Sequence, residues 1–327
     1  MDTRITFNRN GRPDVLQVQQ FDRAKPGVGE VWLEQEAIGV NYLDVTQRNG
    51  AVPIPLPSGI GLEGAGRVVA IGPEVDEVAV GDRVAYALGP TGAYASGRLY
   101  PAERLIKLPD QISFEEAAAI FFKGLTAQYL IKSTYRVEPG TVVLLYGVAG
   151  AVGRILAPWA RRWGATVIGV VSRPESLDAA KAAGCDAVLV WGRDDLPAGI
   201  RAATGGRKAD VVYDAIGRKT FDVSLDCLAP RGTMVSFGAS SGGPDPVAVE
   251  TLNKKGSIYL TRPGLGAHIT AVPEYRERAR DVLEAVASGI IKPHIWKAYA
   301  LRDAARAHED LEAGVSRGAI VLTPRSG

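Results

Sequence analysis

The feature that most constrains the fold is an apolar run in the middle of the chain that is followed at once by spaced glycines. Residues 141–147 read Thr-Val-Val-Leu-Leu-Tyr-Gly, and the next two glycines are Gly150 and Gly153. A continuous apolar run of this kind is typical of a strand buried on both faces of a parallel sheet. Because a helix is expected from about 151 to 163, the glycines are predicted to form a strand-to-helix turn.

Strand and helix patterns alternate beyond this turn. Apolar runs predict strands at 165–171, 187–190, 209–217 and 232–238, and Ala-rich residues 176–184 predict a helix that ends in glycine. This alternation is typical of a doubly wound parallel sheet. Further patterns predict an edge strand at 257–263, helices at 273–288 and 301–313, and a last strand at 318–322.

The first 110 residues have a different pattern and are predicted to be rich in β-strands. Short runs with alternating or β-branched residues occupy 31–40, 66–72 and 82–88, whereas the prolines of 53–59 predict a loop. Ser113 and Glu116 have the spacing of a capping box, which predicts the start of a helix. A second helical stretch is expected after Gly124, up to about residue 136.

The glycine turn predicts a dinucleotide site. Small residues let the backbone approach a pyrophosphate, and a helix N-terminus supplies N–H donors and the positive end of its dipole. The alternative is tight packing of helix on strand without a ligand. The residues predicted to bind the cofactor here are Gly147, Ala149, Gly150, Ala151, Val152 and Gly153.

The end of the next strand bears on which cofactor is bound. An NAD site usually has a carboxylate there for the ribose 2′-hydroxyl, but this chain has Ser172 and Arg173. An arginine pairs well with a 2′-phosphate. Glu175 lies close by and keeps NADH as an alternative, but we predict NADPH.

Composition limits the remaining classes of function. The chain has 327 residues, which predicts about two domains, and its net charge of +2 gives no large field for nucleic acid or anionic lipid. Its two cysteines, Cys185 and Cys227, are too few for a disulfide framework or a four-thiolate zinc site. The N-terminal residues lack the apolar stretch of a signal peptide, and the apolar run 141–152 is too short to span a bilayer. We therefore expect a cytoplasmic protein.

At these motifs the sequence resembles the medium-chain dehydrogenase/reductase superfamily, and within it the zinc-free quinone oxidoreductases that include the zeta-crystallins. The resemblance extends over essentially the whole chain, and only the motifs together are specific. They are GVNYLD (39–44), PSGIGLEGAGRVVAIG (57–72), GDRV (81–84), FFKGLTA (121–127), YGVAGAVG (146–153), YDAIG (213–217), LDCLAPRGTMVSFGASSG (225–242) and LTRP (260–263).

The resemblance implies an α/β fold in which a Rossmann domain is inserted into a β-rich, chaperonin-10-like catalytic domain. The limits expected are 1–125 and 263–327 for the catalytic domain and 126–262 for the Rossmann domain. It also implies a homodimer. An exposed edge strand at 257–263, without a charge or proline before Arg262, would favour the same dimer through pairing of two edges.

Zinc-containing members of the superfamily have a Cys in the segment that matches 39–44 and a His before the matching Glu63. Here Leu62 precedes Glu63, the segment 39–44 has no Cys, and the Cys-rich structural lobe is missing. The histidines His268, His294 and His308 come late in the chain and are predicted to be surface or packing residues. No metal site is therefore expected. A quinone or conjugated enone is already electron-poor, so it accepts hydride without the metal that helps alcohol oxidation.

The resemblance also implies which residues work. Asn41 and Asp44 would border the nicotinamide pocket, and a helix-start segment with Lys123, Gly124 and Thr126 would lie near the nicotinamide ribose. A loop-ordering hydrogen bond for Asp44 and core packing for Phe237 are alternatives, and Glu63 is predicted to be a buried hydrogen-bonding group rather than a base. The other cofactor contacts implied are Phe237, Gly238, Ala239, Ser240, Leu260, Thr261 and Arg262.

The sequence departs from the family at several positions. Thr46 stands where relatives often have an active-site Tyr, and we predict that Tyr42 takes its place. Ser176 and Trp191 stand where many relatives have a Lys and a Tyr near the adenosine phosphate. This departure leaves the phosphate to Arg173, while Trp191 could stack on adenine. Pro158 falls inside the first Rossmann helix, where it removes a backbone hydrogen bond.

Three functions follow from the sequence. The first is an NADPH-dependent quinone reductase that works without metal. The second is a zinc-free NADPH-dependent enone or alkenal double-bond reductase on the same fold. The third is a non-catalytic NADPH-binding or RNA-binding protein of the zeta-crystallin type, against which the near-neutral charge and the absence of a Lys/Arg run argue. We expect a small-molecule substrate and neither a nucleic-acid nor a membrane partner.

Overall fold

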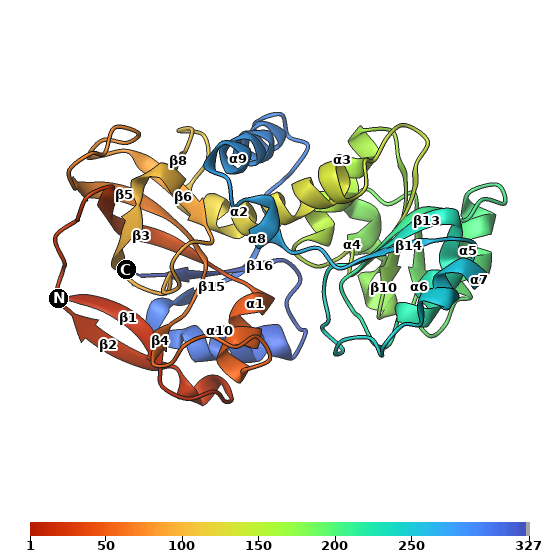
Figure 1. Ribbon diagram of the computed structural model, residues 1–327, viewed down its shortest axis with the longest axis horizontal. Helices are drawn as coiled ribbons and strands as arrows, with labels where there is room; N and C mark the ends of the chain where they lie inside the picture. Colours follow the sequence, from red (N-terminus) through yellow and green to blue (C-terminus); the bar gives the residue numbers. More distant parts are fainter. Residues whose placement is uncertain (325–327) are drawn as a thin grey trace. The chain divides into compact units, whose positions relative to one another are not determined.

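The computed structural model describes residues 1–324, and its contacts divide the chain into two compact units (Figure 1). The first unit comprises Met1–Lys123, Ala271–Arg280 and the chain from Pro293 onward. The second comprises Gly124–Thr270 and Asp281–Lys292. Two helices, α2 (Phe114–Tyr129) and α9 (Val272–Ala287), contribute residues to both units.

The first unit is built mainly on antiparallel strands, with one parallel pair, β15 and β16. One sheet has the order β15-β16-β3-β5-β6-β8, with β7 paired to β3, and a smaller sheet has the order β2-β1-β4. Two helices, α1 (Tyr42–Asn49) and α10 (Ala304–Glu312), complete the unit. The strands are β1 (Asp2–Phe7), β2 (Gln17–Phe21), β3 (Glu30–Val40), β4 (Ser58–Gly59), β5 (Glu63–Ile71), β6 (Arg83–Ala87), β7 (Gly97–Pro101), β8 (Ile106–Lys107), β15 (Ile295–Ala300) and β16 (Ala319–Thr323).

The last strand of the chain completes the sheet that the first residues begin. β16 pairs antiparallel with β3, through Ile320 opposite Val40 and Leu322 opposite Ile38. Their side chains join one apolar core with those of β5 and β6. The N-terminal and C-terminal segments therefore belong to one compact unit, as the family resemblance implied. The predicted loop 53–59 is wrong in one detail, because Ser58 and Gly59 form the short strand β4 against β1.

The second unit is a six-stranded parallel sheet with the order β11-β10-β9-β12-β13-β14. The strand order reverses between β9 and β12, which is the switch point of a doubly wound sheet. The fold class that the sequence predicted is confirmed. The elements are β9 (Val142–Tyr146), α3 (Gly153–Arg162), β10 (Thr166–Val171), α4 (Leu177–Ala182), β11 (Ala187–Val190), α5 (Leu196–Ala203), β12 (Ala209–Asp214), α6 (Phe221–Cys227), β13 (Leu228–Ser236), α7 (Val249–Lys254), β14 (Tyr259–Thr261) and α8 (Leu265–His268).

The core of this unit explains its sequence pattern. All five residues of β9 are buried, as expected for a central strand covered on both faces. Leu196 and Ile200 of α5 pack with Phe221 and Leu225 of α6 in one apolar cluster on the sheet. The edge strand predicted at 257–263 is present but shorter, since only 259–261 pair with β13.

The helix that begins at Ser113 differs from the prediction. Its capping box is confirmed, because Ser113 N donates to Glu116 Oε2 at 2.9 Å and Glu116 N donates to Ser113 Oγ at 3.1 Å. Gly124, however, does not separate two helices, and α2 continues through it to Tyr129. A Cβ at Gly124 would lie 2.6 Å from Val282 Cγ1, so the glycine permits close packing with α9.

Candidate functional site

The turn after β9 has the geometry of a pyrophosphate-binding turn. Gly147 has a φ of +65°, and Gly150 N donates to the Gly147 carbonyl at 2.8 Å. A Cβ on Gly153, the first residue of α3, would lie 2.5 Å from Gly147 O and from Val148 Cα. The Arg154 side chain closes the turn through a 3.0 Å bond from Nε to the Ala149 carbonyl.

These contacts show that the turn fits a dinucleotide. The glycines keep the backbone free of Cβ atoms, so main-chain N–H groups at the start of α3 stay accessible to a pyrophosphate. The turn also lies at the carboxyl end of β9, beside the switch point, where doubly wound sheets bind their ligands. The predicted residues 147–153 are brought together in this turn, and their role as cofactor ligands stays a prediction.

The carboxyl end of β10 carries the residues predicted to select the cofactor. Ser172 and Arg173 follow Val171 directly, and both are exposed. Glu175 is also exposed and lies in the following 3₁₀ turn, Pro174–Ser176. An arginine therefore occupies the position where NAD-binding proteins usually have a carboxylate.

The loop after β13 is held by backbone bonds to β12. Phe237 N and Gly238 N both donate to the Asp214 carbonyl, at 2.9 and 3.2 Å. Arg262 Nη1 donates to Ser236 O at 2.9 Å and to Gly238 O at 2.7 Å. The structure thus gives Arg262 a bracing role on the loop that contains the predicted residues Phe237, Gly238, Ala239 and Ser240. Leu260 and Thr261 lie beside it in β14.

The buried Asp214 side chain orders the turn after β12, and its role was not predicted. Its Oδ1 accepts from Ile216 N and Gly217 N, and its Oδ2 accepts from Thr220 Oγ1 and Ser224 Oγ. The position of an Asp at the end of an apolar strand was the available signal. Because the same residue's carbonyl holds the 237–238 loop, Asp214 links two of the loops at the carboxyl edge of the sheet.

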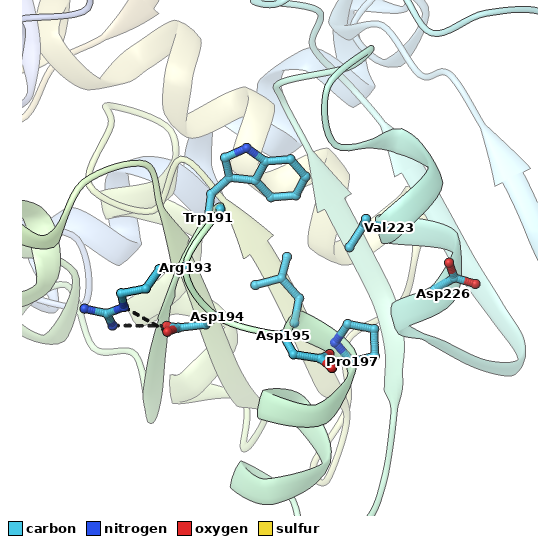
Figure 2. Close-up of a pocket in the computed structure, with 9 residues that line it drawn as sticks. Trp191, Arg193, Asp194, Asp195, Pro197, Val223 and Asp226 are labelled. Atoms are coloured by element: carbon cyan, nitrogen blue, oxygen red, sulfur yellow. Dashed lines mark hydrogen bonds and ion pairs between the residues drawn. The ribbon is translucent and has the colours of Figure 1, made fainter.

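Trp191 lies in a pocket of about 360 Å³ beside α5 and α6 (Figure 2). Its ring meets Tyr146 edge-on, with centroids 6.3 Å apart. Asp194, Asp195 and Asp226 also line the pocket, and Arg193 is paired with Asp194 through bonds of 2.9 and 3.2 Å. This acidic lining disfavours a phosphate in the pocket, which leaves the exposed 172–173 segment as the predicted place for one.

In the first unit a buried carboxylate joins the predicted residues Asn41 and Lys123. Glu63 is fully buried at the start of β5, and its Oε1 accepts from Asn41 Nδ2 at 2.8 Å and from Lys123 Nζ at 2.5 Å. Its Oε2 accepts from Phe122 N at 2.7 Å. A Cβ on Gly39 would lie 2.1 Å from Glu63 Oε1, so β3 must have glycine where it passes this group.

Asp44 is tied to the same place through the start of α1. Asn41 is the N-cap of α1, and its backbone N–H donates to Asp44 Oδ2 at 2.8 Å. The loop-ordering bond considered for Asp44 is therefore present. Burial raises the pKa of the Asp44 carboxyl to about 7, against the opposing effect of its hydrogen bonds from Asn41 and Tyr94. Tyr42 begins the helix and is 41% exposed, while Thr46 Oγ1 bonds the Leu43 carbonyl within it.

One detail of the predicted site is wrong. Lys123, Gly124 and Thr126 lie inside α2 rather than at the start of a helix. Lys123 is buried and paired with Glu63. The histidines were predicted to be surface or packing residues. His308 is fully buried and His268 stacks on Tyr129 with ring centroids 4.4 Å apart, so both are packing residues, while His294 is exposed.

Comparison with known proteins settles the family. The model of the alcohol dehydrogenase GroES-like domain matches residues 27–110, and that of the zinc-binding dehydrogenases matches residues 151–288. Quinone oxidoreductase 1 of Escherichia coli is 44% identical over 99% of this chain and 100% of its own length. The chain belongs to the zinc-free quinone oxidoreductase branch of the medium-chain dehydrogenase/reductase superfamily.

A solved structure and a second relative bear on the site. The crystal structure of the Escherichia coli quinone oxidoreductase complexed with NADPH matches with a TM-score of 0.95 and 44% identity, over 98% of this chain and 100% of that one. A 2-haloacrylate reductase of a Burkholderia species is 41% identical over 98% of both chains. The family thus contains a quinone reductase and a reductase of an unsaturated acid at nearly the same distance from this chain.

Within residues 1–324, no three His, Cys, Asp or Glu side chains lie close enough to hold a metal ion. No helix in that same part of the chain is long and apolar enough to cross a bilayer.

Sequence reasoning missed three side chains that complete the surroundings of Asp44. Tyr94, His308 and Arg48 are all buried and bond to it directly or in series. Tyr94 and His308 are 214 residues apart in the chain. No local pattern could have connected them, since the contact depends on α10 packing beside α1.

Proposed function

We propose that this protein is an NADPH-dependent quinone reductase that works without a metal ion. The observation that carries the proposal is the match along the whole chain to the Escherichia coli quinone oxidoreductase solved with NADPH. The glycine turn 147–153, in which a Cβ on Gly153 would clash with Gly147 O, supports it from the geometry. When bound, NADPH supplies the hydride that reduces the acceptor.

The residues of this chain bind, orient and shield. We propose that the backbone of 147–153 holds the pyrophosphate and that Ser172 and Arg173 take the 2′-phosphate. Asn41, Tyr42, Asp44, Lys123 and Thr126 are proposed to line the nicotinamide pocket. With Lys123 and Asn41 both fixed on Glu63, the polar groups offered there are held in one orientation. Trp191, loop 237–240 and residues 260–262 are the remaining proposed cofactor contacts.

The proposed function is tested by turnover with the purified protein. NADPH should be oxidised with 1,4-naphthoquinone faster than with an alkenal or 2-chloroacrylate, and activity should survive exhaustive chelation. In the same assay Arg173→Ala should weaken NADPH binding about 10–150-fold, since one charge-assisted contact is worth about 1.5–3 kcal/mol. Binding of NADH, which lacks the 2′-phosphate, should change little.

Arg193→Ala is the matched control for this prediction. Arg193 is also an exposed arginine that follows a strand of the parallel sheet, but it is paired with Asp194 in the acidic pocket. It should leave NADPH affinity close to that of the wild type. Equal affinity of the wild-type protein for NADH and NADPH would show that the cofactor assignment is wrong.

A second candidate function is the reduction of an activated carbon–carbon double bond. It is favoured by the 2-haloacrylate reductase that is 41% identical to this chain. The same screen decides between the two, because faster turnover of 2-chloroacrylate or an alkenal would select the double-bond reductase.

We also propose a homodimer formed through β14. This strand is the last in its sheet, and Tyr259 is 62% exposed on it. Light scattering should give about twice 34.6 kDa. Tyr259→Pro, which removes a ladder donor, should give monomer or aggregate, whereas Tyr259→Thr should stay dimeric. A wild-type protein that is monomeric at micromolar concentration would contradict this proposal.

The location and the domain limits remain proposals as well. Both cysteines are free and buried, which suits a reducing compartment, and we propose the cytoplasm with no nucleic-acid or membrane partner. The catalytic domain is proposed to span 1–125 and 263–327, of which residues 325–327 lie outside the described part of the chain. The Rossmann domain is proposed to span 126–262.

A further inference from the structure

A series of buried hydrogen bonds runs from Asp44 to the surface of the first unit. Tyr94 Oη donates to Asp44 Oδ2 at 2.9 Å and lies 3.0 Å from His308 Nε2. His308 Nδ1 lies 3.1 Å from Arg48 Nη1, and Arg48 Nη2 donates to Glu312 at 2.7 Å. Each of the four inner side chains is at most 1% exposed, while the Glu312 side chain is 31% exposed.

The chemistry of the members fixes the direction of every bond. A guanidinium has no acceptor, so Arg48 must donate to His308 Nδ1. A neutral His308 then has its proton on Nε2 and donates it to Tyr94 Oη. The Tyr94 hydroxyl donates its proton to Asp44. Between Arg48 and Asp44 every bond is therefore donated in the direction of Asp44, and His308 has the Nε2–H tautomer.

The charge state of His308 follows from the same contacts. Burial, with a smaller contribution from positive Arg48, lowers the pKa of His308 to about 3. An imidazolium would need both ring nitrogens as donors, and the Nδ1 side is occupied by Arg48. His308 is thus neutral, and its two ring nitrogens connect Arg48 to Tyr94 by hydrogen bonds.

The inner end of the series meets the proposed nicotinamide-pocket residues. Asp44 Oδ2 accepts the Tyr94 hydroxyl and the Asn41 backbone N–H together. Asn41 Nδ2 in turn donates to Glu63, which also holds Lys123. The position of Asn41 is therefore set from two sides, by Glu63 through its side chain and by Asp44 through its backbone.

We propose that Tyr94 and His308 are positioning residues that orient Asp44 and, through it, fix the backbone of Asn41 for the reaction. Neither residue touches the reacting groups in this proposal. It rests on the proposed function, because that function assigns Asn41 and Asp44 to the nicotinamide pocket. The buried series is costly to leave incomplete, since a buried polar group that loses a hydrogen-bond partner is no longer fully compensated for the loss of water.

The pH dependence that serves as a readout involves a defined set of groups around Asp44. Asp44 lies on α1, and the groups that face it come from α1 itself, β5, the segment before β7, α2 and α10. They are Arg48, Glu63, Tyr94, Lys123 and His308.

The test compares two buried tyrosines of the same unit in the full-length protein. Tyr94→Phe removes the donor to Asp44, whereas the control Tyr100→Phe removes another buried hydroxyl, which donates to the Leu88 carbonyl at 2.6 Å. With NADPH and 1,4-naphthoquinone, Tyr94→Phe should lower kcat about tenfold or more with little change in the KM for NADPH. Its activity–pH profile should shift to higher pH, because the lost donor had favoured ionised Asp44.

Rescue by a conservative change separates positioning from packing. His308→Gln can still accept from Arg48 and donate to Tyr94, so it should keep the wild-type pH profile, whereas His308→Leu should shift it as Tyr94→Phe does. A Tyr94→Phe profile that coincides with those of the wild type and Tyr100→Phe would overturn the proposal. So would a shifted profile for His308→Gln that equals that of His308→Leu.

One measurement needs neither a variant nor activity. Nitrogen-15 NMR of the histidine rings in the wild-type protein should show His308 neutral with the proton on Nε2 at pH 6. An imidazolium or the Nδ1–H tautomer would overturn the proposed hydrogen-bond series even if quinone turnover is normal. Absence of NADPH turnover in the wild type together with the Nε2–H tautomer would instead contradict the proposed function and, with it, the role in the reaction.

Discussion

Replacing Glu63 with alanine should lower the free energy of unfolding of the first unit by about 3–5 kcal/mol, because one partner of a buried ion pair is removed. The substitution leaves the Lys123 ammonium, whose side chain is 5% exposed, without its carboxylate. It also removes the acceptor of Asn41 Nδ2 and Phe122 N. Urea unfolding measures the change in the free energy of unfolding, and hydrogen exchange of the β3 and β5 amides measures the change in local stability.

A double-mutant cycle controls for the change in volume. Glu63→Leu with Lys123→Met replaces both charges by apolar groups of similar size, which for buried pairs is often close to neutral. The double variant should therefore be more stable than Glu63→Ala, and a positive coupling between the two positions should appear. If the double variant loses as much stability as the sum of the losses in Glu63→Leu and Lys123→Met, the ion pair does not explain the effect. Activity should be low in both single variants and in the double variant, because Glu63 no longer holds both Lys123 and Asn41.

The parallel sheet was predictable because its signal is local. Val142–Tyr146 is uninterrupted and apolar, and the structure buries each of its residues. The glycine turn was predictable for the same reason, since Gly147, Gly150 and Gly153 are six residues apart at most and their spacing follows from the turn itself. The position of Ser113 and Glu116 likewise predicted a helix start that the structure confirms.

The contacts around Asp44 could not be predicted, because they join residues of different elements that are far apart in the chain. Glu63 meets Lys123 only when β5 packs beside α2, and the two are 60 residues apart. Gly124 was misread for a related reason. Glycine in a helix usually suggests a break, but here the missing Cβ makes room for Val282. Each case is a contact between elements, about which a pattern along one element says nothing.

The pair Asp44 and His308 should make the stability of the protein respond to pH in a specific way. Burial raises the pKa of Asp44 from 3.8 to about 7, so between these values the folded state holds a proton that the unfolded chain has lost. Stability therefore falls as pH rises through this window. Burial lowers the pKa of His308 from 6.5 to about 3, so between these values the unfolded chain holds the extra proton, and stability rises with pH.

Between about pH 4 and 6.5 the two effects oppose each other, because folding moves one proton from His308 to Asp44 without net exchange with solvent. Single variants should reveal the separate slopes, each about 1.4 kcal/mol per pH unit or about 3 kcal/mol over the window. Relative to the wild type, His308→Gln should lose stability as pH rises, and Asp44→Asn should gain it. Both amides preserve the hydrogen bonds of the groups that they replace.

The double variant Asp44→Asn, His308→Gln is the matched control, since it should restore the pH dependence of the wild type. Urea unfolding at intervals from pH 4 to 7 gives the comparison, and only differences from the wild type are used, so other titrating groups cancel. The proton has a place on Asp44: Oδ1 is buried without a hydrogen-bond partner among residues 1–324, while Oδ2 keeps both of its donors. Parallel stability curves for the wild type and both single variants would show that neither group changes its proton affinity on folding. If the stabilities of the two single variants relative to the wild type change with pH in the predicted opposite directions, His308 is neutral only in the folded state, as the hydrogen-bond series requires.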